Sequence, residues 1–145
     1  MITFHGMTDQ LIPVSGSADY YSRVQQLDPH ADQYYRYFEA PGATHCRAGP
    51  GSAVFPSGAF GQLVDWVERG TVPEWLVGGV WVDGSVTEEE RKICPWPFVA
   101  VLRDEGLAGS VEGWECVEGF GFDGVGGRQT VLGEVGRGEF GVFVD

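Results

Sequence analysis

Residues 2–10 read ITFHGMTDQ, and this stretch decides how the first half of the chain is interpreted. Residues 2–4 are apolar or β-branched, which predicts the end of a strand, and the polar residues after them predict a loop that contains Asp9. Ser15 or Ser17 is expected to cap a helix behind this loop, because apolar residues then recur at helical spacing. The opening therefore predicts a strand, a loop and a helix in that order.

A second strand and a second helix are expected next. Residues 34–38 (YYRYF) are aromatic and of strand length, and the loop after them contains His45. The next helix is expected to be capped by Ser57 and to end at Gly70, because glycine adopts the left-handed conformation that often follows a helix. Alternating strands and helices are typical of the α/β class, so we expect an α/β fold.

The chain divides into three regions by composition. Residues 1–75 have the α/β pattern, and residues 76–118 are expected to form an irregular, extended closing arm. This arm starts with an apolar, β-branched run at residues 75–82, which predicts a strand or an extended segment. Residues 87–90 (TEEE) match a capping box, which predicts a short helical turn. Residues 119–145 contain 9 of the 23 glycines and are expected to form a low-complexity tail. Two G-x-G-x-x-G matches there lack the strand-to-helix context of a dinucleotide site.

The composition excludes several function classes. With 9 basic and 21 acidic residues, the 145-residue chain has a formal net charge of −12. This charge repels nucleic-acid phosphates and anionic membrane surfaces, so neither is an expected partner. No apolar run is long enough to span a bilayer, and the first residues lack the segments of a signal peptide. We therefore expect one packed domain, or a piece of one.

Asp9 and His45 are the candidate catalytic residues. Each lies in a loop directly after a predicted strand, and the carboxyl ends of neighbouring strands meet at one edge of an open α/β sheet. The separation of 36 residues is what one helix and one strand would occupy. A histidine that acts as a general base needs a buried acid on its Nδ1 to hold one tautomer. We expect the two side chains to lie near hydrogen-bond distance, although loop Asp and His residues are also common on solvated surfaces.

The other histidines have plainer interpretations. His5 lies close in sequence to Asp9, and a zinc site with His45 and Cys46 is conceivable. However, adjacent His45 and Cys46 do not easily face one ion, so no metal is expected. His30 is expected to be exposed in a polar loop.

The cysteines leave two interpretations open. There are three of them, Cys46, Cys94 and Cys116. Either all three are reduced thiols, or two form a bridge and the third is left over. The composition alone does not decide between these alternatives.

Several separated motifs resemble the C-terminal part of the tannase and feruloyl esterase family. They occur in the family's order, and the resemblance covers residues 2 to about 116. They are HGMTDQLIP at residues 5–13, DYY at 19–21, PGATHC at 41–46, LVDWVE at 63–68 and CPWPFVA at 94–100.

The resemblance implies a fold and a set of site residues. Its members are secreted serine esterases of the α/β-hydrolase fold, so residues 1–75 would be the last strands and helices of that sheet. Asp9 would be the acid and His45 the base of a Ser-His-Asp triad. Cys46 would bridge to a cysteine beside the nucleophilic serine, and Cys94 would bridge to Cys116.

The chain departs from the family pattern in one respect. A Gly-x-Ser-x-Gly elbow is expected before the acid, and these 145 residues contain none. The resemblance therefore implies a carboxylic ester hydrolase that acts on small phenolic-acid esters, with its nucleophile outside this chain and the chain itself inactive. It implies secretion, and no cofactor on this chain, because the family's calcium site lies in a lid domain that is absent here. The alternative is a non-catalytic acidic fragment or partner-binding domain, and the oligomeric state is left open.

Overall fold

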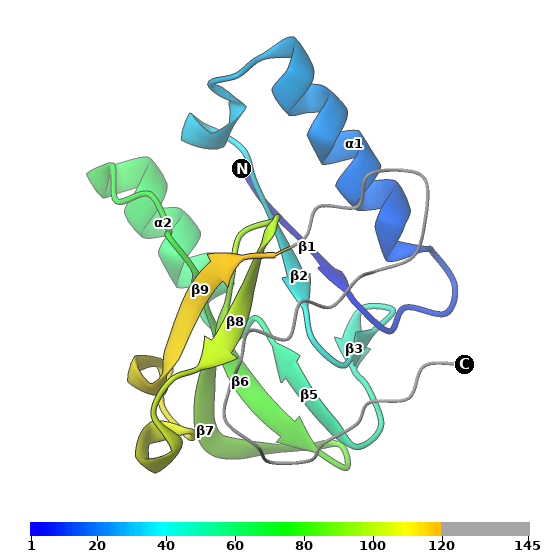
Figure 1. The fold of residues 1–145 in the computed structure, drawn as a ribbon, viewed down its shortest axis with the longest axis vertical. Helices are drawn as coiled ribbons and strands as arrows, with labels where there is room; N and C mark the ends of the chain where they lie inside the picture. The colour runs from blue at the N-terminus through cyan, green and yellow to red at the C-terminus, as the bar shows by residue number, and fades with distance from the viewer. Residues whose placement is uncertain (120–145) are drawn as a thin grey trace.

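The computed structural model describes residues 1–119, which form an α/β fold with two α-helices and nine strands (Figure 1). The low-complexity tail expected at residues 119–145 lies outside the described residues from position 120 onward. No helix of the described part is long and apolar enough to cross a membrane. The elements are β1 (Ile2–Gly6), α1 (Val14–Leu27), β2 (Arg36–Ala40), β3 (Ala43–Thr44), β4 (Arg47–Ala48), β5 (Ser52–Phe55), α2 (Ala59–Arg69), β6 (Leu76–Val82), β7 (Ser85–Ile93), β8 (Phe98–Leu102) and β9 (Trp114–Glu118), with 3-10 turns at Ala31–Gln33, Glu105–Leu107 and Val111–Gly113.

The first three elements form a βαβ unit. Strands β1 and β2 are parallel, with register from Ile2 opposite Arg36 to Gly6 opposite Ala40, and α1 connects them. The helix begins after Pro13, so the expected cap at Ser15 or Ser17 is wrong. Proline fixes the backbone angle that a helix start needs, and the Ser17 hydroxyl is used elsewhere, in a hydrogen bond to His5.

The second strand begins later than the sequence predicts, at Arg36 instead of residue 34. The backbone N–H groups of Tyr34 and Tyr35 both donate to the carbonyl of Ala31, which closes a 3-10 turn. These N–H groups are therefore not free to pair with β1. The aromatic run is shared between a turn and a strand.

The expected loops at residues 41–56 contain regular structure. Strands β3 and β4 form a hairpin with His45 and Cys46 at its tip, and β5 pairs with β6. Helix α2 then follows Gly58, and the Ser57 hydroxyl accepts from the backbone of Gly79 instead of capping the helix. Gly70 ends the helix in the left-handed conformation, as predicted.

Residues 76–118 are not an irregular arm. Strands β6 and β7 form a long antiparallel hairpin, and β8 pairs with β9. Residues 87–90 lie in β7 and form no helical turn, because the Thr87 hydroxyl donates to the Val80 carbonyl across the hairpin. Asp83 and Gly84, both with positive φ, form the turn, and an Asp-Gly pair between apolar runs is the sequence signal for it.

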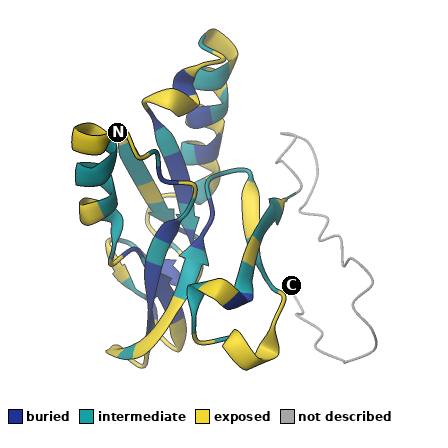
Figure 2. Ribbon diagram, turned by 90° about the vertical axis from the view of Figure 1, so that its left-hand side faces the viewer, coloured by how far each residue is buried: buried dark blue, intermediate teal, exposed yellow. Residues whose placement is uncertain are grey.

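Two buried clusters hold these elements together (Figure 2). Helices α1 and α2 lie on opposite sides of the strands, and α1 buries its face while α2 buries no residue. Phe60 and Val67 on α2 are 79% and 76% exposed. The first cluster contains Phe38, Ala40, Ala43, Val54, Leu76 and Ile93, and the second contains Ala18, Tyr21, Tyr35 and Tyr37.

The closing strands are attached directly to β2. The backbone N–H of Trp96 donates to the carbonyl of Tyr37 (2.8 Å), and Pro95 lies opposite Phe38 in an isolated bridge. The Trp96 ring packs edge-on against Tyr21 of α1. Residues 94–98 therefore support the strand that leads to the hairpin carrying His45.

Candidate acid–base site

The loop after β1 is fixed by hydrogen bonds to the segment after β2. The backbone N–H of Met7 donates to Ala40, and both the N–H and the hydroxyl of Thr8 donate to the Ala43 carbonyl (3.0 and 2.9 Å). Gly6 allows this approach, because a Cβ there would lie 2.3 Å from the Ala43 oxygen. The loop that carries Asp9 is thus held against the start of the histidine hairpin.

His45 lies at the tip of the β3–β4 hairpin, directly after a buried pair of residues. Thr44 faces Arg47 in the hairpin register, and the Thr44 hydroxyl donates to the Arg47 carbonyl (3.3 Å). Cys46 completes the turn with φ 57°, in the left-handed region that is uncommon outside glycine. This tight turn directs the imidazole of His45 toward Asp9.

The structure brings the two predicted site residues together. Nδ1 of His45 lies 2.9 Å from Oδ2 of Asp9. The Asp9 side chain is only 5% exposed, whereas that of His45 is 40% exposed. The expected geometry is confirmed, and the catalytic roles of the two residues stay a prediction at this point.

The other carboxylate oxygen of Asp9 is held by the backbone. Oδ1 accepts from the N–H groups of Leu11 (2.8 Å) and Ile12 (3.0 Å). Burial alone would raise the pKa of Asp9, but the bond from Ile12, the bonds from His45 and Leu11 and the charge of His45 together hold this pKa well below its ordinary value of 3.8. Asp9 is therefore an anion at neutral pH.

This arrangement defines what each ring nitrogen of His45 does. An ionised carboxylate only accepts hydrogen bonds, so Nδ1 carries the hydrogen and donates to Asp9. In the neutral ring, Nε2 is then the basic nitrogen. No residue among 1–119 is hydrogen-bonded to Nε2. The pair has the form of a general base that is held in one tautomer and has its working nitrogen free.

Sequence reasoning missed the part that His5 has in the site. The ring Nε2 of His5 lies 3.2 Å from the same Asp9 oxygen and 3.1 Å from the Ile12 carbonyl, and Nδ1 lies 2.8 Å from the Ser17 hydroxyl. The signal in the sequence is the spacing of four residues between His5 and Asp9, which a tight turn after a strand can bring together.

No group of three metal-ligating side chains was found among the described residues.

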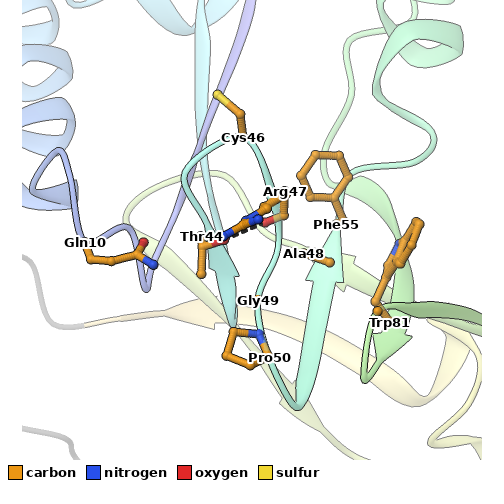
Figure 3. Close-up of a pocket in the computed structure, with 10 residues that line it drawn as sticks. Gln10, Thr44, Cys46, Arg47, Ala48, Gly49, Pro50, Phe55 and Trp81 are labelled. Atoms are coloured by element: carbon orange, nitrogen blue, oxygen red, sulfur yellow. Dashed lines mark hydrogen bonds between the residues drawn. The ribbon is translucent and has the colours of Figure 1, made fainter.

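An open hollow of about 730 Å³ is lined in part by residues next to Asp9 and His45 in the sequence (Figure 3). Gln10, next to Asp9, lies on one side of it, and Thr44 and Cys46, the neighbours of His45, come from the hairpin. Phe55 and Trp81 stand on the opposite side, on the paired strands β5 and β6. Sequence neighbours of both Asp9 and His45 therefore line a hollow whose opposite side is aromatic.

A comparison with protein families decides the relationship. The family model described as tannase and feruloyl esterase matches residues 1–117. The chain belongs to the tannase and feruloyl esterase family. The resemblance seen in the motifs is thereby confirmed.

The chain is similar to individual proteins of known or assigned activity, and it covers only part of the length of each. A probable feruloyl esterase B from Aspergillus clavatus is 33% identical over 135 aligned positions, covering 81% of this chain and 26% of that protein. A mono(2-hydroxyethyl) terephthalate hydrolase from Piscinibacter sakaiensis is 34% identical, covering 80% and 19%. The crystal structure of an esterase from Aspergillus oryzae matches with a TM-score of 0.67 and 30% identity, covering 80% and 27%. The chain spans about a quarter of the length of the first of these relatives.

Of the two alternatives for the cysteines, the structure has one disulfide bridge and one remaining thiol. Cys94 and Cys116 form a disulfide, with Cα atoms 5.6 Å apart, so this prediction is confirmed. Cys46 is free and exposed. His30 is exposed as expected, and its ring Nδ1 is hydrogen-bonded to the side-chain amide of Gln33.

Proposed function

We propose that the chain supplies the acid–base pair of a serine-type carboxylic ester hydrolase. The observation that supports this is the contact between His45 Nδ1 and Asp9 Oδ2 at 2.9 Å, in a chain whose relatives include feruloyl esterases. Asp9 would orient the imidazole and stabilise the imidazolium. His45 Nε2 would move the protons.

The proposed reaction has two proton-transfer steps at one nitrogen. Nε2 of His45 takes the proton of a serine hydroxyl as the serine oxygen bonds to the ester carbonyl carbon. It then gives this proton to the leaving alcohol as the ester C–O bond breaks, which leaves an acyl-enzyme. In the second half, Nε2 takes a proton from water, whose oxygen attacks the acyl carbon, and returns the proton to the serine.

The serine would come from a part of the protein outside these 145 residues. The chain contains no Gly-x-Ser-x-Gly motif. Two surfaces of the described part are open to a further segment of the protein. The free edge of β1 is one, since β1 pairs only with β2 there, and the exposed Phe60 and Val67 on α2 are the other. We infer that an α/β-hydrolase sheet continues beyond β1, and that the serine lies on that continuation.

The proposed substrates are small esters of phenolic or related aromatic acids. Relatives are named for feruloyl esters and for a terephthalate monoester, and both are esters of aromatic acids. We further propose that Cys46 bridges to a cysteine beside the serine and that the enzyme is secreted. The disulfide between Cys94 and Cys116 supports secretion, since such bonds persist in oxidising compartments.

The test is complementation. The 145-residue chain is assayed with methyl ferulate and methyl gallate, alone and as a fusion enzyme, joined to the N-terminal part of a related feruloyl esterase up to that protein's counterpart of β1. We expect no turnover by the chain alone and turnover by the fusion. His45→Ala should abolish the fusion's activity, and the matched control His30→Ala should not, since His30 is exposed and away from Asp9.

Two outcomes would contradict the proposal. Turnover by the isolated chain that survives His45→Ala would place the chemistry on another residue. A folded fusion that shows no turnover and in which Cys46 remains a free thiol would favour the non-catalytic, partner-binding alternative.

A further inference from the structure

We propose that His5 is a positioning residue for the Asp9 carboxylate, an inference that rests on the acid–base function proposed above. His5 lies on β1, its side chain is 11% exposed, and both of its ring nitrogens face polar atoms of the fold. No step of the proposed reaction uses it. The following contacts explain what it does instead.

The hydrogen on His5 can be assigned from its neighbours. Nε2 faces the Ile12 carbonyl at 3.1 Å and Asp9 Oδ2 at 3.2 Å, and both of these oxygens are acceptors only. Nε2 therefore carries a hydrogen. In the neutral ring Nδ1 accepts, and the Ser17 hydroxyl at 2.8 Å is its donor.

The contacts of His5 close the turn that presents Asp9. Ile12 donates its N–H to Asp9 Oδ1 and accepts from His5 through its carbonyl. The ring thus holds the far end of the turn in place while the same nitrogen lies against Oδ2. With both oxygens of Asp9 contacted, the carboxylate has one orientation available, and that orientation faces His45 Nδ1.

The network continues into the βαβ unit. Ser17 lies on α1, whose Ala18 and Tyr21 pack with Tyr37 of β2 in the second buried cluster. Tyr37 donates to Glu39 Oε1 (3.3 Å). Burial raises the pKa of the Tyr37 phenol, as does the charge of Glu39, so the hydroxyl keeps its hydrogen. His5 therefore ties the turn at Asp9 directly to α1 and, through that buried cluster, to β2.

The same contacts distinguish His5 from His45. Both nitrogens of His5 are occupied, by carbonyl and carboxylate oxygens on one side and by Ser17 on the other. Among residues 1–119, His45 has a partner only at Nδ1, and its Nε2 has none. Two imidazoles thus share one carboxylate oxygen, and of these two rings only that of His45 has a nitrogen without a partner among residues 1–119.

The experiment uses two substitutions that separate the ring nitrogens. In His5→Gln the side-chain amide N–H takes the place of Nε2, so the contact to Ile12 and Asp9 is kept. In His5→Asn the amide reaches only the place of Nδ1, and that contact is lost. The readout is solvent exchange of the His45 Nδ1 hydrogen, followed by NMR on the 145-residue chain. The indole N–H of Trp114, which donates to Ala108 far from the site, reports on the fold.

We expect His5→Asn to accelerate exchange of this hydrogen about tenfold or more, and His5→Gln to keep it close to the wild-type rate, with the Trp114 signal unchanged in both. Wild-type exchange in His5→Asn, or equal acceleration in both variants, would overturn the proposal. The exchange measurement does not need turnover, so it tests the positioning role independently of the complementation assay. Wild-type exchange in His5→Asn contradicts the positioning role even if the fusion enzyme is active. An inactive fusion contradicts the proposed function whatever His5 does.

Discussion

Residues 2–40 form a parallel βαβ unit, whereas residues 76–118 form antiparallel pairs of strands with a disulfide from the end of β7 to β9. The first unit presents Asp9, the proposed acid of the triad, in the loop that follows β1. That loop is held by hydrogen bonds to the backbone of Ala40 and Ala43 and to the rings of His5 and His45. The second contributes no residue to the acid–base pair, and its order comes from strand pairing and a covalent link.

The segments that present the proposed acid–base pair therefore differ from the segments that are expected to contribute mainly to stability. Parallel strands bring the ends of distant segments to one edge, which is where Asp9 and His45 meet. The antiparallel region contacts β2 through Trp96 and Pro95, so it supports that edge from behind. We therefore expect substitutions in the two regions to have separable effects on turnover and on unfolding.

The largest expected effect is on turnover, from Asp9→Asn in the fusion enzyme. An amide at this position no longer fixes the His45 tautomer, so kcat should fall by about 10⁴ with little change in KM. Asp19→Asn, an exposed aspartate on α1 that pairs with Arg23, is the matched control and should keep wild-type kinetics. Steady-state kinetics with methyl ferulate measure both. A loss below about tenfold for Asp9→Asn would remove the acid role from Asp9.

The next effect is on stability, from the double variant Cys94→Ala/Cys116→Ala. The disulfide closes a separation of 22 residues, and opening it should lower the free energy of unfolding by about 3 kcal/mol in the chain-entropy model. Urea unfolding measures the change, and Cys46→Ala, at a free and exposed cysteine, should stay within about 0.5 kcal/mol of wild type. Loss of the protected His45 Nδ1 hydrogen in a folded double variant would show that the two regions are not separable.

A smaller effect is expected where the two segments of the site touch. In Gly6→Ala the new Cβ would lie 2.3 Å from the Ala43 oxygen and 2.7 Å from the Thr44 oxygen, so the histidine hairpin must move. We expect a loss of about 1–3 kcal/mol in unfolding free energy, with lower kcat in the fusion. Gly16→Ala in α1 meets nothing within 4 Å and should stabilise by about 0.5 kcal/mol. Equal behaviour of the two variants would contradict the close packing at Gly6.

The smallest effect is a pH dependence of stability. The pKa of Asp9 is lower in the folded chain than its ordinary value of 3.8, so the stability it contributes is fully present above that value. That stability is lost as the pH falls from about 4 toward the folded pKa. Asp9→Asn should flatten this part of the curve of unfolding free energy against pH. Asp28, whose pKa is lowered by the hydroxyl of Tyr34, gives the comparison variant Asp28→Asn. An unchanged acid limb in Asp9→Asn would argue against an ionised Asp9.

The parts of the fold that follow from local sequence could be predicted. The strand at residues 2–4, the helix that follows the Asp9 loop and the end of α2 at Gly70 depend on patterns within a few residues. The approach of Asp9 to His45 could be predicted too, because loops after consecutive parallel strands meet at one edge.

The remaining parts depend on contacts between distant segments. Thr87 and the glutamates after it look like a helix start, but pairing with β6 across the Asp83 turn makes them a strand. Ser17 and Ser57 look like helix caps, but their hydroxyls bind His5 and the backbone of Gly79. The contact of His5 with Asp9 appears only once the turn between them is built.

The most direct test of the account is the protonation of the His45 ring, read from its nitrogen-15 NMR shifts in the 145-residue chain at about pH 9, above the ordinary histidine pKa of about 6.5. The contact with the Asp9 carboxylate predicts a hydrogen on Nδ1 and none on Nε2. A wild-type chain with the hydrogen on Nε2 instead would contradict the account, because the nitrogen that should face the serine would then be unable to accept a proton.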